Sequence, residues 1–220
     1  MTKNNKKLIK GCENIALSQK EREKLILKAE KHFGKFLTSL GFDWENDPNM
    51  SETPHRVTKA YVEEILAGNF HPMPKITAFE DSDKETIYDG IICQTDIEIK
   101  SVCSHHFLSF DGVCHIAYLP DEEKGTLIGL SKLNRIADFY ARRPQVQERL
   151  TRQIHDAIDA EIPNNRGVAV MLECKHTCCS HRGIGHKSTM KTTYVSKMFR
   201  EDASVKDEFL FAIQRQNNIR

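Results

Sequence analysis

The chain is 220 residues long, a length typical of one domain or at most two, and it is long enough to bury a substantial core. Hydrophobic residues make up 39% and charged residues 29%, which excludes a fibrous or disordered protein. The formal net charge of +1 excludes strong global attraction to nucleic acid or to an anionic membrane, although a local basic site stays possible.

The cellular context can also be predicted from the sequence. No apolar run approaches the roughly 18 residues of a membrane helix, and the basic N-terminus lacks the apolar segment of a secretory signal. Seven cysteines are an odd number at low density, which argues against a secreted disulfide scaffold. We therefore expect a cytoplasmic protein with no membrane partner, in which cysteine beside histidine indicates metal binding or catalysis.

The N-terminal third predicts two helices. Residues 1–17 are polar, and we expect a flexible segment there. Ser18 and Glu21 have the spacing of a capping box, and apolar residues then recur at helical spacing as far as Gly41. A second helix is expected over 53–68, with Thr-Pro at its start.

The period of the hydrophobic pattern changes to two after residue 85, which indicates strands. Strands are expected over 96–101, 110–119, 167–178 and 192–195, and helices from Ser131, from Pro144 and over 205–214. The order of helices, strands, helices and strands predicts an α+β fold with an antiparallel sheet and helices packed on one face. With no linker and no internal repeat visible, residues 18–220 are expected to form a single domain.

Two short motifs predict a metal site. Cys103-x-x-His106 places two good zinc ligands one turn apart, and about 70 residues later His176-x-Cys178 would point both side chains to the same side of a strand. Mixed thiolate and imidazole ligands favour zinc.

The ligand set leaves two kinds of site open. A structural site would be closed by two cysteines and two histidines, whereas a catalytic site would use three protein ligands and keep one position for water. Further candidates crowd the same segments, and surplus histidine beside a metal suits proton transfer. These additional residues are His105, Cys179 and His181.

A basic helix start predicts an anion site. Ser131, Lys132 and Arg135 lie where backbone donors and the helix dipole favour anions, and Arg182 lies just beyond the metal strand and could join them. The alternative is a solvated basic helix start, but the set favours a substrate that carries phosphate.

Glu148 allows two interpretations. Helical phase points it away from the apolar stripe of its helix, so it could form an exposed ion pair with Arg152 at i+4. It could instead accept hydrogen bonds from neighbouring N–H donors of a ligand.

Three long segments resemble the GTP cyclohydrolase I family: SVCSHHFLSFDGVCHIAYLP, IGLSKLNRIADFYARRPQVQERLTRQI and GVAVMLECKHTCCSHRG. The likeness also reaches SETPHRVTKAYVEEI and DEFLFAI, and it covers about residues 18–215. The resemblance implies the tunnelling fold, in which antiparallel sheets of several subunits join into a barrel with helices outside. It also implies a homodecamer of two pentamers with active sites at subunit interfaces.

The resemblance also implies roles for individual residues. The zinc ligands would be Cys103, His106 and Cys178, with one zinc per subunit and water in the fourth position. His105 and His176 would be acid/base histidines, and Gln147 and Glu148 lie in a Q-E-R motif whose Glu holds the guanine edge. The triphosphate and ribose contacts would be Ser131, Lys132, Arg135 and Arg182, with Arg56 and Lys59 supplied by a neighbouring subunit. Ser104 departs from the Glu that the family often has between Cys and His, and we expect it to alter the surroundings of the zinc rather than the activity.

The implied reaction is zinc-dependent hydrolysis of GTP at C8 of the purine, with release of formate. Ribose rearrangement and ring closure then give 7,8-dihydroneopterin triphosphate, the first step of tetrahydrofolate or pterin biosynthesis. A structural zinc module that binds nucleic acid is disfavoured by the net charge of +1 and by the absence of zinc-finger spacing. The other alternative is a relative with the same fold that acts on pterins or reduces a deazapurine nitrile, and a basic cluster beside zinc with no dinucleotide motif disfavours the reductase.

Overall fold

The computed structural model describes residues 8–80 and 87–214. The chain divides into two compact units. Unit 1 comprises residues 1–73 and 142–144, and unit 2 comprises residues 74–141 and 145–220. The single domain expected over 18–220 stays a prediction. Within the described ranges, no helix is both long and apolar enough to cross a membrane.

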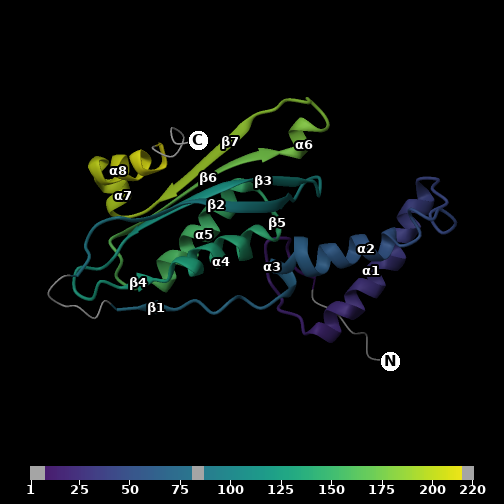
Figure 1. Cartoon of the computed structure of the whole chain (residues 1–220), viewed down its shortest axis with the longest axis horizontal. Coiled ribbons are helices and arrows are strands. Elements are labelled where there is room, and N and C mark those ends of the chain that lie inside the picture. The colour runs from purple at the N-terminus through teal and green to yellow at the C-terminus, as the bar shows by residue number, and fades with distance from the viewer. Residues whose placement is uncertain (1–7, 81–86, 215–220) are drawn as a thin grey trace. The chain divides into compact units, whose positions relative to one another are not determined.

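Unit 1 is helical (Figure 1). Its elements are α1 (Gln19–Ser39), α2 (Thr53–Ala60), the π-helical turn η1 (Tyr61–Ile65) and α3 (Ala67–Phe70). The capping box is confirmed, because the Glu21 carboxylate accepts a hydrogen bond from the Ser18 backbone N–H at 2.9 Å. The second predicted helix is interrupted by the π turn.

The N-terminal segment contacts α3, and the flexibility expected over 1–17 stays a prediction. The Asn14 side-chain amide donates to the carbonyl oxygens of Gly68 (2.8 Å) and His71 (2.6 Å). The side-chain amide of Asn69 donates in return to two carbonyl oxygens of the segment. Its last part therefore contacts α3, while its first seven residues lie outside the described residues.

Unit 2 is built on a five-stranded sheet of order β5-β2-β3-β6-β7, in which β2, β3, β6 and β7 pair antiparallel. The strands are β2 (Ile92–Cys103), β3 (Ser109–Leu119), β5 (Pro144–Gln145), β6 (Gly167–His176) and β7 (Thr189–Val195). A small antiparallel pair joins β1 (Ala78–Phe79) to β4 (Leu127–Ile128). The predicted α+β class with an antiparallel sheet is confirmed.

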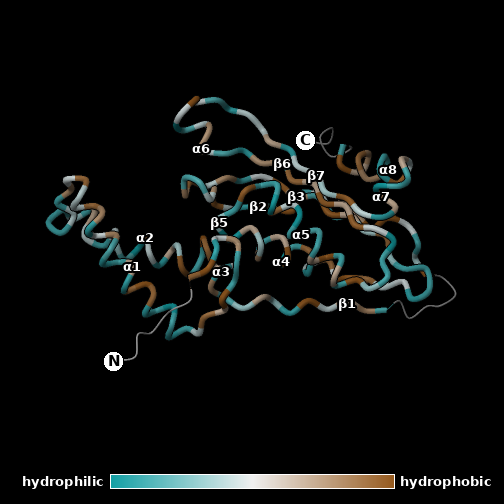
Figure 2. The backbone as a smooth tube through the Cα atoms, turned by 180° about the vertical axis from the view of Figure 1, so that it is seen from behind, coloured by the Kyte–Doolittle hydropathy of each residue, from teal (hydrophilic) through white to brown (hydrophobic). Residues whose placement is uncertain are grey.

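Helices cover both faces of this sheet (Figure 1). The long helices α4 (Leu130–Ala141) and α5 (Gln147–Glu161) pack on one face, as predicted. Their interface is a core of fully buried aliphatic and aromatic side chains, among them Ile99, Phe110, Ile116, Ile136 and Ile154. The C-terminal helices α7 (Met198–Glu201) and α8 (Ala203–Gln214) add cover on the opposite face through Phe199 and Phe209. Figure 2 shows hydrophobic residues concentrated in the strands between these layers.

Strand β2 has two distinct ends. At the Gln94 end, the Gln94 side chain donates to the side-chain oxygen of Asn134 in the first turns of α4. A bulge follows, where Asp96 has a φ of 56° and its N–H donates to Nδ1 of buried His115 at 3.3 Å. Nine residue steps lead from Gln94 to Cys103, which corresponds to about 30 Å of strand.

Candidate metal centre and active site

The Cys103 end of β2 forms a candidate metal centre. Cys103 ends β2, His106 follows in the hairpin and Cys178 lies in α6 (Thr177–Ser180), and their ligand atoms all lie within 4.8 Å of one another. Cys103 Sγ is 3.8 Å from His106 Nδ1. Tetrahedral zinc, with bonds of about 2.3 Å to sulfur and 2.0–2.1 Å to nitrogen, places such ligand atoms about 3.6–3.8 Å apart. The three residues therefore fit zinc.

The hairpin after β2 turns His106 back toward Cys103. The Cys103 N–H donates to the Leu108 carbonyl at 2.8 Å, and the Phe107 N–H donates to the Cys103 carbonyl at 2.9 Å. Phe107 has a φ of 55°, in the left-handed region that most side chains avoid. This tight turn brings the side chains of Cys103 and His106 to the same site.

Cys178 reaches the site from a helical turn, which corrects the predicted geometry. The strand expected over 167–178 ends at His176, and α6 begins at the next residue. The Thr177 hydroxyl donates to the Ser109 carbonyl at 2.5 Å, which ties the turn to the start of β3. The prediction that His176 and Cys178 share one side of a strand is therefore wrong, because the chain changes direction between them.

The Cys178 thiol holds its proton tightly. Burial, together with the neighbouring thiols of Cys103 and Cys179, raises the pKa of Cys178 to about 11. A metal must displace this proton, because the thiolate is the ligand. Cys179 is exposed beside the group and has no further role that the structure explains.

His176 lies beside the metal group but outside it. Its ring stacks on Phe110 with centroids 4.4 Å apart and planes 12° from parallel, and its Nε2 lies 2.8 Å from Gln147 Oε1. Among the described residues, the metal group thus has three ligands, and His176 does not complete the closed four-ligand site. Burial lowers the pKa of His176, and the Glu148 carboxylate acts in the opposite direction.

Gln147 and Glu148 begin α5 and face different surroundings. Gln147 is only 1% exposed, whereas Glu148 is exposed. Arg152 Nε lies 3.4 Å from Asp156 Oδ2, so in the described part of the chain Arg152 pairs with Asp156 and not with Glu148. The exposed ion pair offered as an alternative for Glu148 is therefore wrong.

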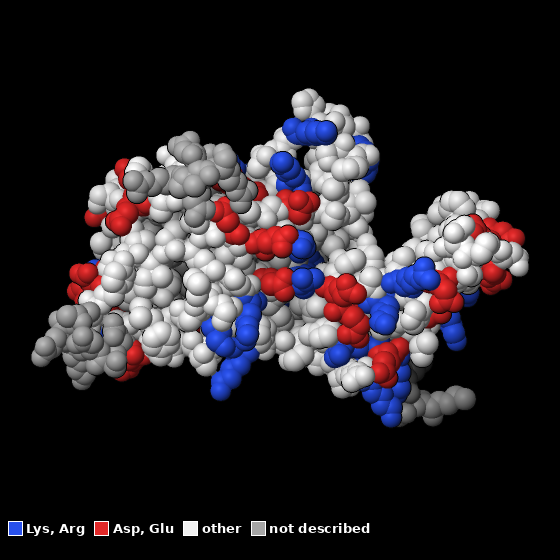
Figure 3. Space-filling view, in the orientation of Figure 1, with Lys and Arg blue, Asp and Glu red and all other residues white. Residues whose placement is uncertain are grey.

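His105 and Arg182 also lie at this end of unit 2. His105 is exposed in the hairpin, with its ring edge-on to His106 at a centroid distance of 6.3 Å. Arg182 is exposed in the loop between α6 and β7, with Lys187 beyond it. Figure 3 shows basic side chains over α6 and this loop.

The basic start of α4 lies elsewhere. Ser131, Lys132 and Arg135 are in the first turns of α4, which Gln94 joins to the far end of β2. The helix begins at Leu130, so Ser131 is inside it rather than capping it. Within one chain, α4 thus begins near the end of β2 that is opposite the metal group.

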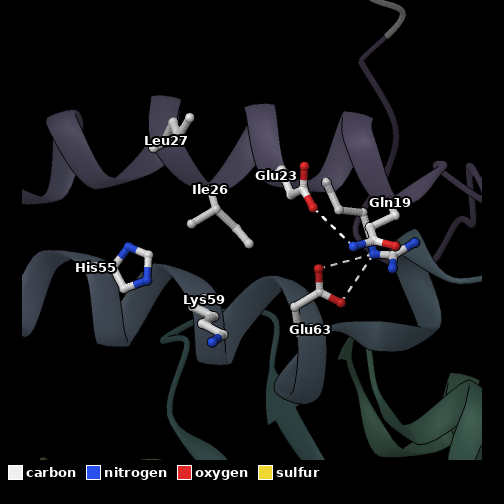
Figure 4. A pocket seen from close by; sticks show the side chains of 8 residues that line it. Gln19, Glu23, Ile26, Leu27, His55, Lys59 and Glu63 are labelled. Atoms are coloured by element: carbon white, nitrogen blue, oxygen red, sulfur yellow. Dashed lines mark hydrogen bonds and ion pairs between the residues drawn. The ribbon is translucent and has the colours of Figure 1, made fainter.

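Arg56 and Lys59 are exposed on α2 in unit 1. Lys59 lines a hollow of about 520 Å³ between α1 and α2, together with Ile26 and Glu63 (Figure 4). Glu63 there holds Arg22 in an ion pair of 3.1 Å.

Three residues of the site could not be found from sequence motifs: Phe110, Thr151 and Thr192. Phe110 stacks on His176 because the two are paired across β3 and β6. Thr151 and Thr192 bond to each other at 2.6 Å across 41 residues and surround Gln147. The only local signal was the i, i+4 spacing of Gln147 and Thr151.

Two thiols and an imidazole that could hold a metal ion lie beside a fixed histidine on an α+β fold, an arrangement typical of an enzyme. Residues 29–214 match the family model of GTP cyclohydrolase I. GTP cyclohydrolase 1 of Aeromonas hydrophila is 40% identical over 92% of this chain and 88% of its own. That of Wigglesworthia glossinidia brevipalpis is 40% identical over 84% and 83%. The chain belongs to the GTP cyclohydrolase I family.

A solved structure of the archaeosine synthase QueF-Like in the apo form aligns with a TM-score of 0.35 at 18% identity, over 48% of this chain and 94% of that chain.

Proposed function

We propose that the chain hydrolyses GTP at C8, releases formate and forms 7,8-dihydroneopterin triphosphate, the first step of a tetrahydrofolate or pterin pathway. Family membership supports the substrate. The observation that carries the residue roles is the group of Cys103, His106 and Cys178 beside His176. The proposal includes a cytoplasmic location, where the seven free cysteines would stay reduced.

Cys103, His106 and Cys178 would hold one zinc ion per subunit. When bound, zinc supplies Lewis-acid activation of the attacking water. His105 and His176 would move protons to and from the imidazole ring of the purine. The exposed carboxylate of Glu148 would accept from the guanine N1–H and 2-amino group, which are two adjacent donors that adenine does not offer in that arrangement.

The triphosphate would be bound by basic residues from more than one copy of the chain. Arg182 lies at the Cys103 end, but α4, which carries Ser131, Lys132 and Arg135 in its first turns, begins at the Gln94 end. This separation within one chain favours two copies of the chain around each triphosphate. We therefore propose that a neighbouring subunit supplies these residues of α4, that Arg56 and Lys59 also come from a neighbour, and that the assembly is a decamer of two pentamers.

Mixed oligomers test this arrangement. Cys103→Ala subunits are expected to be inactive, and Arg135→Ala subunits are expected to keep about a tenth of parental activity at GTP well below KM. The two variants are unfolded together, refolded at equal ratio with zinc and given GTP at that low concentration. If every site takes its metal from one copy and Arg135 from another, about a quarter of the sites regain both residues. Formate release and the pterin chromophore measure activity.

A mixture no more active than the two separate variants would place both residues in one chain. Parental protein taken through the same treatment is the control for recovery. If parental protein releases no formate from GTP, the proposed reaction itself is wrong.

A further inference from the structure

The side chain of Gln147 has only one possible orientation. Its Nε2 lies 3.2 Å from the Leu172 carbonyl oxygen and 3.0 Å from that of Met190. Carbonyl oxygens only accept hydrogen bonds, so the amide atom that faces them must be the nitrogen. Nε2 is also 3.1 Å from the Thr192 hydroxyl. The amide oxygen therefore points the other way, toward His176.

Two hydroxyl groups support the same orientation. Thr151 donates its single hydrogen to the backbone carbonyl of Gln147 at 2.8 Å. The Thr151 and Thr192 hydroxyl oxygens are 2.6 Å apart, so Thr192 must donate to Thr151. The Thr192 oxygen then has a free lone pair for the Gln147 amide, and every hydrogen in the network has an acceptor.

This network determines which nitrogen of His176 carries hydrogen. Gln147 Oε1 can only accept, and it lies 2.8 Å from His176 Nε2, so Nε2 must be the donor. Stacking on Phe110 fixes the ring plane. In a neutral imidazole with hydrogen on Nε2, the lone pair is on Nδ1.

We propose that Gln147, Thr151 and Thr192 are positioning residues that hold His176 in the Nε2–H tautomer. Nδ1 is then the nitrogen whose lone pair is available to GTP, and the hydrogen bond from Nε2–H to Gln147 Oε1 keeps the ring from turning. This inference rests on the proposed function of His176.

The tautomer can be measured without turnover. Zinc-loaded protein with ¹⁵N-labelled histidine is studied by solid-state NMR, and His176 is assigned by the signals lost in His176→Asn. We expect hydrogen on Nε2 and a bare Nδ1 in the parent, and a mixture of tautomers in Gln147→Met. Hydrogen on Nδ1 in the parental protein would overturn the inference even if GTP is hydrolysed normally.

Kinetics test the two threonines. In Thr151→Val with Thr192→Val, we expect kcat for GTP to fall about tenfold while KM stays within about twofold, because the ring is mispositioned and substrate binding is not. Thr151→Ser keeps the hydroxyl and should stay within about twofold of parental kcat. Thr193→Val, exposed one position along β7, is the matched control and should keep parental kcat.

Parental kcat in the double variant, or a Thr151→Ser variant as slow as the double variant, would refute the role of the network. If the double variant does not fold, two measurements still test the inference: the tautomer of His176 in the parental protein and kcat of Thr151→Ser relative to the parent. If no variant or parent turns GTP over, the NMR result stands alone, and the failure lies with the proposed function.

Discussion

The Cys103 end of β2 and its Gln94 end differ in how their polar groups are engaged. At the Cys103 end, His176 is stacked on one side chain and hydrogen-bonded to another, and the metal ligands lie within 4.8 Å of one another. At the Gln94 end, Lys132 donates to the Lys75 carbonyl at 3.3 Å, and Arg135 is exposed. At the Cys103 end, the side chains already hold one another in place. At the Gln94 end, the cations are available to bind an anion from outside the chain.

The difference predicts two kinds of mutational effect. Substitutions at the Cys103 end should lower kcat or disturb the fold, because those side chains hold one another in place. Substitutions at the Gln94 end should raise KM or leave catalysis intact, because those side chains supply charge and little internal order.

Glu148→Gln should give the largest effect. An amide turns one acceptor into a donor and opposes one of the two guanine donors, which costs roughly 3 kcal/mol of polar complementarity. We expect kcat/KM for GTP to fall about a hundredfold or more with zinc content unchanged. Glu208→Gln, exposed on α8, is the control. Equal kcat/KM in parent and Glu148→Gln would mean that guanine is recognised elsewhere.

Gly112→Ala should disrupt the Cys103 end through the backbone. A Cβ at Gly112 would lie 2.0 Å from the Glu173 carbonyl oxygen and 2.7 Å from Cys174 Cα, so β3 and β6 would have to separate. We expect the free energy of unfolding in urea to fall by about 3 kcal/mol. Gly129→Ala is the control, because its Cβ would meet only the flexible Lys132 side chain at 3.6 Å. If Gly112→Ala loses no more free energy of unfolding than Gly129→Ala, then β3 and β6 tolerate the added Cβ.

Arg135→Ala should act on binding alone. We expect KM for GTP to rise about tenfold with kcat within about twofold, and the salt dependence of binding to weaken, because one cation of the triphosphate site is lost. Arg152→Ala removes an exposed arginine that pairs with Asp156 and should leave KM unchanged. An unchanged KM in Arg135→Ala would mean that Arg135 is a solvated surface residue that does not bind GTP.

The sequence predicted the parts of the site that depend on local spacing. Cys103-x-x-His106 needs only one tight turn, and the position of Glu148 on its helix follows from helical phase. The strand end at His176 could not be predicted, because Cys178 is apolar enough to continue the pattern and only the turn of α6 removes it.

The rest depends on pairing between distant segments. Phe110 and His176 meet because β3 and β6 pair in that register, and Thr192 reaches Gln147 because α5 packs beside β7. Arg135 is in the first turns of α4, and α4 begins at the Gln94 end of β2. The periodicity of the sequence does not show at which end of a strand a helix begins.

His115 gives the smallest predicted effect and tests the Gln94 end as a structural element. Burial lowers the pKa of His115 from its usual 6.5, against the opposing carboxylates of Asp96 and Glu173, while Lys191 lowers it further. The unfolded chain therefore takes up a proton at a higher pH than the folded chain. Stability is full above about pH 6.5 and is lost as the pH falls toward the folded pKa.

In His115→Asn, the side-chain oxygen can replace Nδ1 as acceptor for the Asp96 N–H, but it does not titrate. Urea unfolding of parent and variant from about pH 8 to pH 5 should show equal pH dependence above about 6.5. Below it, the parent should lose up to about 1.4 kcal/mol per pH unit more than the variant. Loss of zinc in acid affects both proteins alike, so the difference between them isolates His115. Parallel curves throughout would mean that the ring is hydrated in the folded state, and that the bulge at Asp96 does not depend on an uncharged histidine.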